Sequence, residues 1–276
     1  MQRLVLFGKG GSGKTTVSSN LSTVYAGAGQ RVLHVGCDPK RDSLLCLVDH
    51  IPQRSALDRL LEEQEVHDPA ELIVRGRHGQ DCIDTGGLEA GLGCGGRGVL
   101  LVVEAVQRLG LLRDGAYDVA LFDVLGDLVC GGFTAPMRPG VGEKVFVVLS
   151  DDVMSLFAAN SIARAIRTYE EHGIRLGGLL VNAPARGWDR ALVQRFAERL
   201  STQVLATIPR SPRIREAERT RRTVVEAFPR SRAAGTFRKL ARTIEALDVA
   251  ALPSPTPMGD VELVEFCRPG PAAGDP

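Results

Sequence analysis

The sequence lacks any long apolar run, since no window reaches the ~18 consecutive apolar residues that a membrane span needs. Its first residues, MQRLVLFGKGG, hold too short an apolar stretch for a signal peptide and no small-residue cleavage site. An excess of one charge is also missing, because 34 basic residues face 33 acidic ones and the formal net charge is +1. A balance of this kind does not favour binding to nucleic acid or a membrane surface. We therefore expect a soluble, cytoplasmic protein with neither nucleic acid nor membrane as a partner.

The chain also lacks a Cys-x-x-Cys pair, although it has six cysteines: Cys37, Cys46, Cys82, Cys94, Cys130 and Cys267. This absence argues against a zinc ribbon or a ferredoxin-type loop. An intracellular chain is also an unfavourable setting for a framework of disulfides. Any cysteines that bind metal must therefore be brought together by folding.

What the chain does have is a regular alternation of short apolar strands and helices, which is typical of a parallel sheet covered on both faces. Strands are expected at 3–7, 31–36, 81–84, 119–123, 144–149, 176–181 and 203–208. Helices are expected at 14–28, 98–109, 152–171, 188–200 and 233–247. With 276 residues, one α/β domain over 1–250 fits best, and the Pro- and Gly-rich segment 251–276 reads as an irregular C-terminal tail.

The strongest motif is GKGGSGKT at residues 8–15, between a strand and a helix. It matches the P-loop pattern in the context that makes the pattern credible. Its glycines let backbone N–H groups point at phosphate oxygens, and the helix that follows adds the positive end of its dipole. Lys14 is expected to reach the β- and γ-phosphates of ATP, and the Thr15 hydroxyl to bind Mg²⁺. The fold class is therefore a single-domain P-loop NTPase with a mostly parallel, doubly wound sheet.

A second lysine, Lys9, lies inside this loop. An ordinary P-loop does not need it, and the motif resembles the deviant Walker A loop of dimeric ATPases in which this lysine reaches the partner subunit's nucleotide. Lys9 therefore predicts a homodimer. The alternative is a solvated surface lysine.

Carboxylates follow two of the expected strands, where α/β sheets bind their ligands. Asp123 ends an apolar strand and suits the Walker B role of holding Mg²⁺ through water. Asp38 or Asp127 could orient the attacking water, because phosphoryl transfer depends on positioning and charge neutralisation. Glycine at 126 would let its loop move when the γ-phosphate is lost. Asp38 and Asp42 could instead cap helices.

Two cysteines stand among glycines, Cys94 in GLGCGGRG and Cys130 in DLVCGGF. Glycines let bare backbone donate N–H groups to a cluster sulfur. A 4Fe–4S cluster takes four thiolates, so a twofold dimer with two from each chain would complete the set. The spacing by itself does not separate this arrangement from two ordinary core cysteines.

Seven motifs together resemble the nitrogenase iron protein family, which includes the reductase subunits of nitrogenase-like enzymes. They are GKGGSGKT, GCDPKRDS, GLGCGGRG, DVLGDLVCGGF, AANSI, RLGGLLVN and IPR, in the family's order and spacing over residues 2–250. The resemblance implies that Cys94 and Cys130 ligate a 4Fe–4S cluster that bridges the homodimer. It also implies ATP and Mg²⁺ as cofactors, a ferredoxin or flavodoxin as electron donor, and a heteromeric catalytic component as recipient.

The same resemblance assigns roles to individual residues. Catalytic positions are Lys9, Asp38 and Asp127, with Asp127 in a switch segment near the attacking water. Residues expected to bind the nucleotide and Mg²⁺ are Gly8, Lys9, Gly10, Gly11, Ser12, Gly13, Lys14, Thr15, Thr16, Asp38, Lys40, Asp42 and Asp123, with Asn182, Pro209 and Arg210 on the adenine side. Arg97 matches an arginine that some members have reversibly ADP-ribosylated.

The chain departs from the family at its docking surface. Ser211 replaces a usual aspartate, Val141 replaces a basic docking residue, and the charge is nearly neutral where nitrogenase reductases are acidic. Charge guides docking, so the partner and its final substrate (dinitrogen, a tetrapyrrole or a carbon–sulfur compound) stay open. Two alternatives without a redox role share the Lys9 motif: the partitioning and positioning ATPases, and metallochaperones of the same fold, which usually carry Cys-x-x-Cys.

Overall fold

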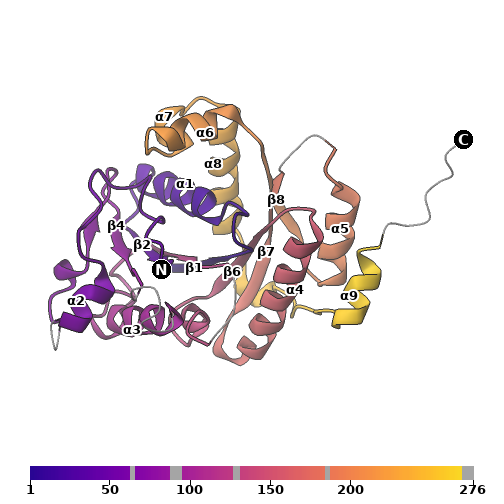
Figure 1. Cartoon of the computed structure of the whole chain (residues 1–276), viewed down its shortest axis with the longest axis horizontal. Coiled ribbons are helices and arrows are strands. Elements are labelled where there is room, and N and C mark those ends of the chain that lie inside the picture. Colours follow the sequence, from indigo (N-terminus) through magenta and orange to yellow (C-terminus); the bar gives the residue numbers. More distant parts are fainter. Residues whose placement is uncertain (63–65, 88–94, 127–130, 184–186, 269–276) are drawn as a thin grey trace, which may run out of the picture.

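The computed structural model describes residues 1–62, 66–87, 95–126, 131–183 and 187–268, in which strands and helices alternate (Figure 1). The strands are β1 (Gln2–Phe7), β2 (Val32–Cys37), β3 (Val74–Arg75), β4 (Asp81–Asp84), β5 (Val119–Val124), β6 (Lys144–Leu149), β7 (Arg175–Ala183) and β8 (Val204–Pro209). The helices are α1 (Lys14–Gly27), α2 (Ala56–Glu62), α3 (Gly95–Arg108), α4 (Val153–Thr168), α5 (Arg190–Arg199), α6 (Pro212–Arg219), α7 (Val224–Ala227), α8 (Arg232–Glu245) and α9 (Asp260–Phe266).

The strands of this described part form one sheet in the order β3-β4-β2-β5-β1-β6-β7-β8. Every neighbouring pair is parallel except β3 with β4, which is antiparallel. β5 lies between β1 and β2, and Asp123 is in register with Leu6 of β1 and Gly36 of β2. The segments that leave β1, β2 and β5 therefore start side by side at one edge of the sheet.

Helices cover both faces of the sheet (Figure 1). Leu4 and Leu6 of β1 pack into a core shared with α1, α6, α7 and α8, whereas Val5 and Phe7 pack into a core shared with α2, α3, α4, α5 and α9. This alternation is what a strand buried on both faces produces. The expected doubly wound P-loop fold is confirmed.

All seven expected strands and all five expected helices are present; β4 and β6 have the expected ends, and the other elements begin or end at other residues than expected. The expected ranges do not include β3, α2, α6, α7 and α9, which have only two, seven, eight, four and seven residues. So few residues show little periodicity. α3 begins at Gly95, three residues before its expected start. The expected start was too late because the first turn is rich in glycine, which disfavours a helix in a reading of the sequence.

The sequence predicts an irregular tail over 251–276. The structure differs, because α9 forms within this segment. Leu263 is buried against the sheet's core and the ring of Phe266 lies 6.1 Å from that of Phe196 on α5. Arg164 of α4 also pairs with Asp260 at 2.5 Å. Leu263 and Phe266 are three positions apart, as on one face of a helix, but the many prolines and glycines around them made this helical spacing hard to recognise in the sequence.

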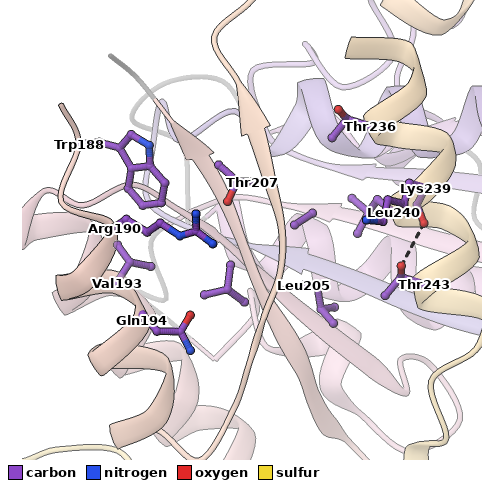
Figure 2. A pocket seen from close by; sticks show the side chains of 12 residues that line it. Trp188, Arg190, Val193, Gln194, Leu205, Thr207, Thr236, Lys239, Leu240 and Thr243 are labelled. Atoms are coloured by element: carbon purple, nitrogen blue, oxygen red, sulfur yellow. Dashed lines mark hydrogen bonds between the residues drawn. The ribbon is translucent and has the colours of Figure 1, made fainter. Parts of the chain in front are cut away.

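The outer edge of β8 faces a groove of about 360 Å³ between α5 and α8 (Figure 2). Residues Val204 to Thr207 line its floor, Trp188 and Arg190 lie on one side, and Lys239 lies on the other. No described strand pairs with this edge of the sheet. Among the described helices, none is long and apolar enough to cross a membrane.

Candidate functional site: a nucleotide loop beside the cysteine segments

The loop between β1 and α1 is shaped by its glycines. Gly13 adopts φ 92°, a left-handed conformation, and a Cβ there would lie 2.3 Å from Nδ2 of Asn182. At Gly8, with φ 148°, a Cβ would lie 2.0 Å from the carbonyl oxygen of Val148. Side chains at either position would therefore force the loop away from the sheet.

Asn182, at the end of β7, supports this loop from below. Its Nδ2 donates to the carbonyl oxygen of Ser12 at 2.8 Å. Lys14, the first residue of α1, is mostly buried and its Nζ donates to the carbonyl oxygen of Lys9 at 3.2 Å. The ammonium group thus lies within the curl of the loop, where a bound phosphate would be.

Asp123, at the end of β5, receives two hydroxyl groups on one carboxylate oxygen. Thr15 and Ser43 both donate to its Oδ2 at 2.8 Å. Ser43 reaches this position because Gly36 leaves room on β2, where a Cβ would lie 2.5 Å from the Cβ of Ser43. Three neighbouring strand ends therefore place their oxygen-bearing side chains together.

The donor set fits a magnesium ion. Asp123 is 2% exposed, and within the described residues its Oδ1 has no hydrogen-bond partner; the same is true of Oδ1 of Asp42. Buried carboxylate oxygens of this kind need a cation or ordered water. Oxygen atoms of a carboxylate and a threonine hydroxyl are ligands that Mg²⁺ prefers.

Burial raises the pKa of Asp123 to about 6, although hydrogen bonds from Ser43 and Thr15 and the charge of Lys14 act in the opposite direction. Burial, followed by the charge of Asp38, also raises the pKa of Asp42. At both carboxyl groups burial thus outweighs the opposing positive charges, which come from Lys14 at Asp123 and from Lys40 and Lys14 at Asp42. A divalent cation would add further positive charge beside them.

Among the described elements no helix begins after Asp38 or Asp42, since the next helix along the chain is α2 at Ala56–Glu62. Oδ1 of Asp38 accepts from the backbone N–H of Lys40 at 2.8 Å, which closes a tight turn after β2. Arg41 continues this turn in a left-handed conformation with φ 62°, and its Nε donates to Oδ2 of buried Asp84 at 2.6 Å. The segment is therefore held by its own turn and by a buried ion pair.

Two of the predicted adenine-side residues and Thr16 can be placed by their neighbours. Asn182 and Ile208 are register partners, as are Ala183 and Pro209, so the expected adenine-side residues stand at adjacent strand ends. Thr16, in the first turn of α1, donates to Oε1 of Glu218 on α6 at 2.6 Å. A hollow of about 230 Å³ opens beside Thr15 and Thr16.

Glycine contacts connect the nucleotide loop with the segments that carry the two predicted cluster cysteines. A Cβ on Gly126 would lie 2.2 Å from the carbonyl oxygen of Gly8, so the segment after β5 rests directly on the loop. A Cβ on Gly132 would lie 1.9 Å from the carbonyl oxygen of Gly96. Backbone touches backbone at both places, which only glycine permits.

Pro39 provides another connection. Its ring carbons lie against Gly87 and Gly95, where added Cβ atoms would be 2.5 and 3.0 Å from it. Gly87 and Gly95 flank the segment with Cys94, and Pro39 follows Asp38 directly. The turn beside the nucleotide site thus contacts both ends of that cysteine segment.

Three predicted residues, Cys94, Cys130 and Asp127, lie outside the described residues. Elsewhere in the chain that the structure describes, no three His, Cys, Asp or Glu side chains are grouped to hold a metal. Cys37, Cys46, Cys82 and Cys267 are free thiols. Arg97 lies exposed in the first turn of α3.

Three residues that contact the site were not among those predicted from the sequence. Ser43 directly follows a predicted aspartate, and Asp152 follows β6 at a strand end, so both positions carried a usable signal. Glu218 carried none, because 202 residues separate it from Thr16. Lys9 does not extend freely into solvent, since its Nζ donates to Oδ1 of Asp152 at 3.2 Å.

The fold and the loop define a P-loop nucleotide-binding protein of the α/β class. The chain belongs to the family of 4Fe-4S iron sulfur cluster binding proteins, NifH/frxC family, whose model matches residues 2–268. It is 40% identical to nitrogenase iron protein 2 of Methanothermobacter thermautotrophicus over 269 residues, which cover 97% of this chain and 98% of that protein. The family predicted from the motifs is confirmed.

Solved structures show the same fold at low identity. The septum site-determining protein MinD of Pyrococcus horikoshii, complexed with Mg-ADP, has a TM-score of 0.68 and 22% identity, covering 89% of this chain and 97% of that one. A ParA family ATPase from Chlorobium tepidum has a TM-score of 0.69 and 16% identity, covering 88% and 99%. At such identities the likeness concerns the fold alone.

Proposed function

We propose that this chain is the ATP-hydrolysing, electron-donating component of a nitrogenase or nitrogenase-like two-component enzyme and that it works as a homodimer. The observation that carries the proposal is a pair of close backbone contacts, one on either side of residues 127–130. Gly126 rests on the loop, and Gly132 rests on Gly96. The family match over residues 2–268 supports the same reading.

In the proposed mechanism the loop residues bind and orient ATP. Backbone N–H groups of residues 8–13 and the ammonium of Lys14 hold the phosphates, and Thr15 and Asp123 hold Mg²⁺. Lys9 turns toward the partner subunit's nucleotide. Asp38 and Asp127 orient the attacking water, and Asn182, Pro209 and Arg210 line the adenine side.

Cys94 and Cys130 of each subunit would hold the cluster between the two chains. A bound 4Fe–4S cluster supplies one-electron chemistry, accepting an electron from a ferredoxin or flavodoxin and giving it to the catalytic component. The chain's own contribution is to couple the position of the two cysteines to whether ATP or ADP is bound. If the segment after β5 moves when the γ-phosphate is lost, the contact between Gly132 and Gly96 would shift with it.

Two variants separate the two halves of this proposal. Cys94→Ser should remove the cluster and leave ATP binding nearly unchanged, whereas Lys14→Gln should keep the cluster and abolish ATP-driven electron transfer. Anaerobic purification, iron analysis, EPR spectroscopy and nucleotide titration measure these properties. Cys267→Ser, which changes a free cysteine far along the chain, is the matched control and should keep its iron.

The expected wild-type protein is a brown, EPR-active dimer. A protein that stays colourless after complete cluster reconstitution would rule out the redox role. If Lys14→Gln still supported electron transfer, the role of ATP in gating would be wrong.

A further inference from the structure

Lys9 and Asp152 form an ion pair across two segments of the same chain. Lys9 belongs to the nucleotide loop after β1, and Asp152 immediately precedes α4, which follows β6. Nζ of Lys9 lies 3.2 Å from Oδ1 of Asp152, and the two side chains are 40% and 51% exposed. β1 and β6 are neighbours in the sheet, so the loops that follow them start side by side.

The carboxylate of Asp152 is held in place by contacts other than the one with Lys9. It caps α4, because its Oδ1 accepts from the backbone N–H of Ser155 at 2.9 Å, and its Oδ2 accepts from the hydroxyl of Ser150. Burial would raise the pKa of Asp152, but the hydrogen bonds from Ser150 and Lys9 hold it below its ordinary value. A fixed anion at a helix N-terminus is a well-organised acceptor for one ammonium group.

The backbone of Lys9 is constrained as well. Its carbonyl oxygen accepts from Nζ of Lys14 at 3.2 Å and from the N–H of Ser12 at 3.1 Å. Gly126 packs against its carbonyl carbon. Because the backbone is held, the side chain alone decides whether the ammonium faces α4 or a phosphate.

We propose that Asp152 is a positioning residue that holds Lys9 away from phosphate in the nucleotide-free chain, so that engaging the nucleotide requires exchange of this carboxylate for phosphate oxygens. The inference rests on the proposed dimeric ATPase, in which Lys9 faces the partner's nucleotide. Exposed pairs of this kind are weak, so the exchange is reversible at ordinary ATP concentrations. Asp152 thereby raises the nucleotide concentration at which Lys9 engages.

The first test measures Lys9 directly, without nucleotide. Acetylation of Lys9 by a water-soluble N-hydroxysuccinimide ester is followed by mass spectrometry, with exposed Lys40 as internal reference. Asp152→Asn keeps a good N-cap and removes the charge, and should speed acetylation of Lys9 about two- to fivefold relative to Lys40. Asp152→Ser, another good cap but too short to reach the amine, should do the same. Unchanged acetylation of Lys9 in both variants would overturn the proposal.

The second test measures function in the whole protein. Asp152→Asn should lower the Mg-ATP concentration for half-maximal binding, measured by nucleotide titration, by about two- to fivefold. The same change in a Lys9→Ala background, where binding is measured without any need for hydrolysis, should have no effect. Asp189→Asn, at the cap of α5, is the matched control and should leave the value unchanged. An equal shift in the Lys9→Ala background would show that Asp152 acts through something other than Lys9. If the wild-type protein hydrolyses no ATP, the proposed function is wrong. The acetylation experiment would still show whether Asp152 holds Lys9.

Discussion

His34 is a fully buried histidine in the middle of β2. Its register partners are Cys82 on β4 and Leu121 on β5, and neither ring nitrogen has a hydrogen-bond partner among the described residues. Burial lowers the pKa of His34 to about 3. The native protein therefore holds this ring neutral, while an unfolded chain protonates it below a pH of about 6.5.

This difference makes stability depend on pH. Between pH 6.5 and 3 the unfolded state binds more protons at this residue, so the free energy of unfolding falls as the pH falls. Replacing His34 by leucine should remove this dependence, so that the loss of stability from pH 7 to pH 5 is smaller by about 2 kcal/mol. Urea unfolding at pH 7 and at pH 5 measures this change in the free energy of unfolding. His50→Leu, at an exposed histidine, should lose as much stability as the wild type; equal losses in all three proteins would contradict the prediction.

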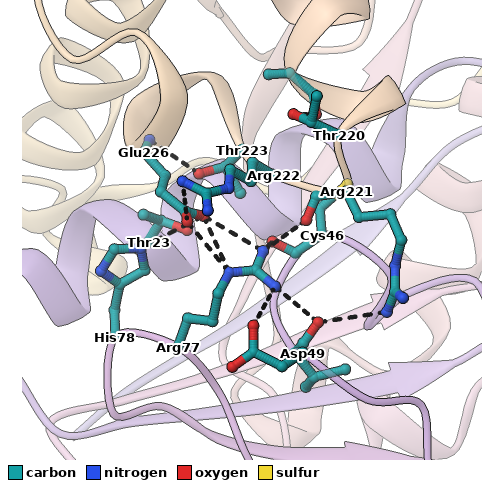
Figure 3. A network of polar contacts seen from close by, with 12 residues as sticks. Thr23, Cys46, Asp49, Arg77, His78, Thr220, Arg221, Arg222, Thr223 and Glu226 are labelled. Atoms are coloured by element: carbon teal, nitrogen blue, oxygen red, sulfur yellow. Dashed lines mark hydrogen bonds and ion pairs between the residues drawn. The ribbon is translucent and has the colours of Figure 1, made fainter.

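At the scale of elements, a mostly buried guanidinium lies at the centre of a network of polar contacts (Figure 3). Arg77, between β3 and β4, donates to the carbonyl oxygens of Cys46 and Val48 at 2.7 Å and of Arg221 at 2.6 Å. Its Nε lies 3.2 Å from Oε1 of Glu226 on α7. The loop that follows Ser43 is thereby tied to the connection between α6 and α7.

Removal of one member of the Arg77–Glu226 pair should be costly, because the side chains are only 14% and 11% exposed and the remaining charge would stay largely buried. Arg77→Ala should cost about 3–5 kcal/mol of unfolding free energy, since it leaves a mostly buried carboxylate with weaker partners. Arg54→Ala, which breaks a pair with Glu62 in which both side chains are more than half exposed, should cost less than about 1 kcal/mol.

Urea unfolding of Arg77→Ala, Glu226→Ala and the double variant measures the coupling between the two side chains. Coupling indistinguishable from zero would show that the network does not act as a unit.

These contacts show what the sequence can and cannot predict. The loop, Lys14, Thr15 and Asp123 were predictable because each belongs to a local motif or to the end of an apolar strand. The Lys9–Asp152 and Thr16–Glu218 contacts join residues 143 and 202 positions apart, and no local pattern records such partners. Arg77 was missed for the same reason, since its partners lie on three separate segments.

At the scale of the whole molecule, the proposed dimer requires the two cysteine segments of each chain to be placed correctly before two chains could share a cluster. The contact between Gly132 and Gly96 joins these segments within one chain. It lies two residues after Cys130 and two after Cys94. An error here would therefore displace the expected ligands without touching the nucleotide loop.

Gly132→Ala tests this geometry, because its Cβ would lie 1.9 Å from the carbonyl oxygen of Gly96 and 2.1 Å from the carbonyl carbon. Backbone atoms cannot move aside cheaply, so the two segments must separate. We expect anaerobically purified Gly132→Ala to retain less than about half of the wild-type iron per dimer and to bind Mg-ATP within about twofold of the wild type. Gly131→Ala is the matched control, since a Cβ there has no neighbour within 4 Å among the described residues. Wild-type iron in Gly132→Ala, or equal iron loss in both variants, would show that this contact does not organise the cluster site.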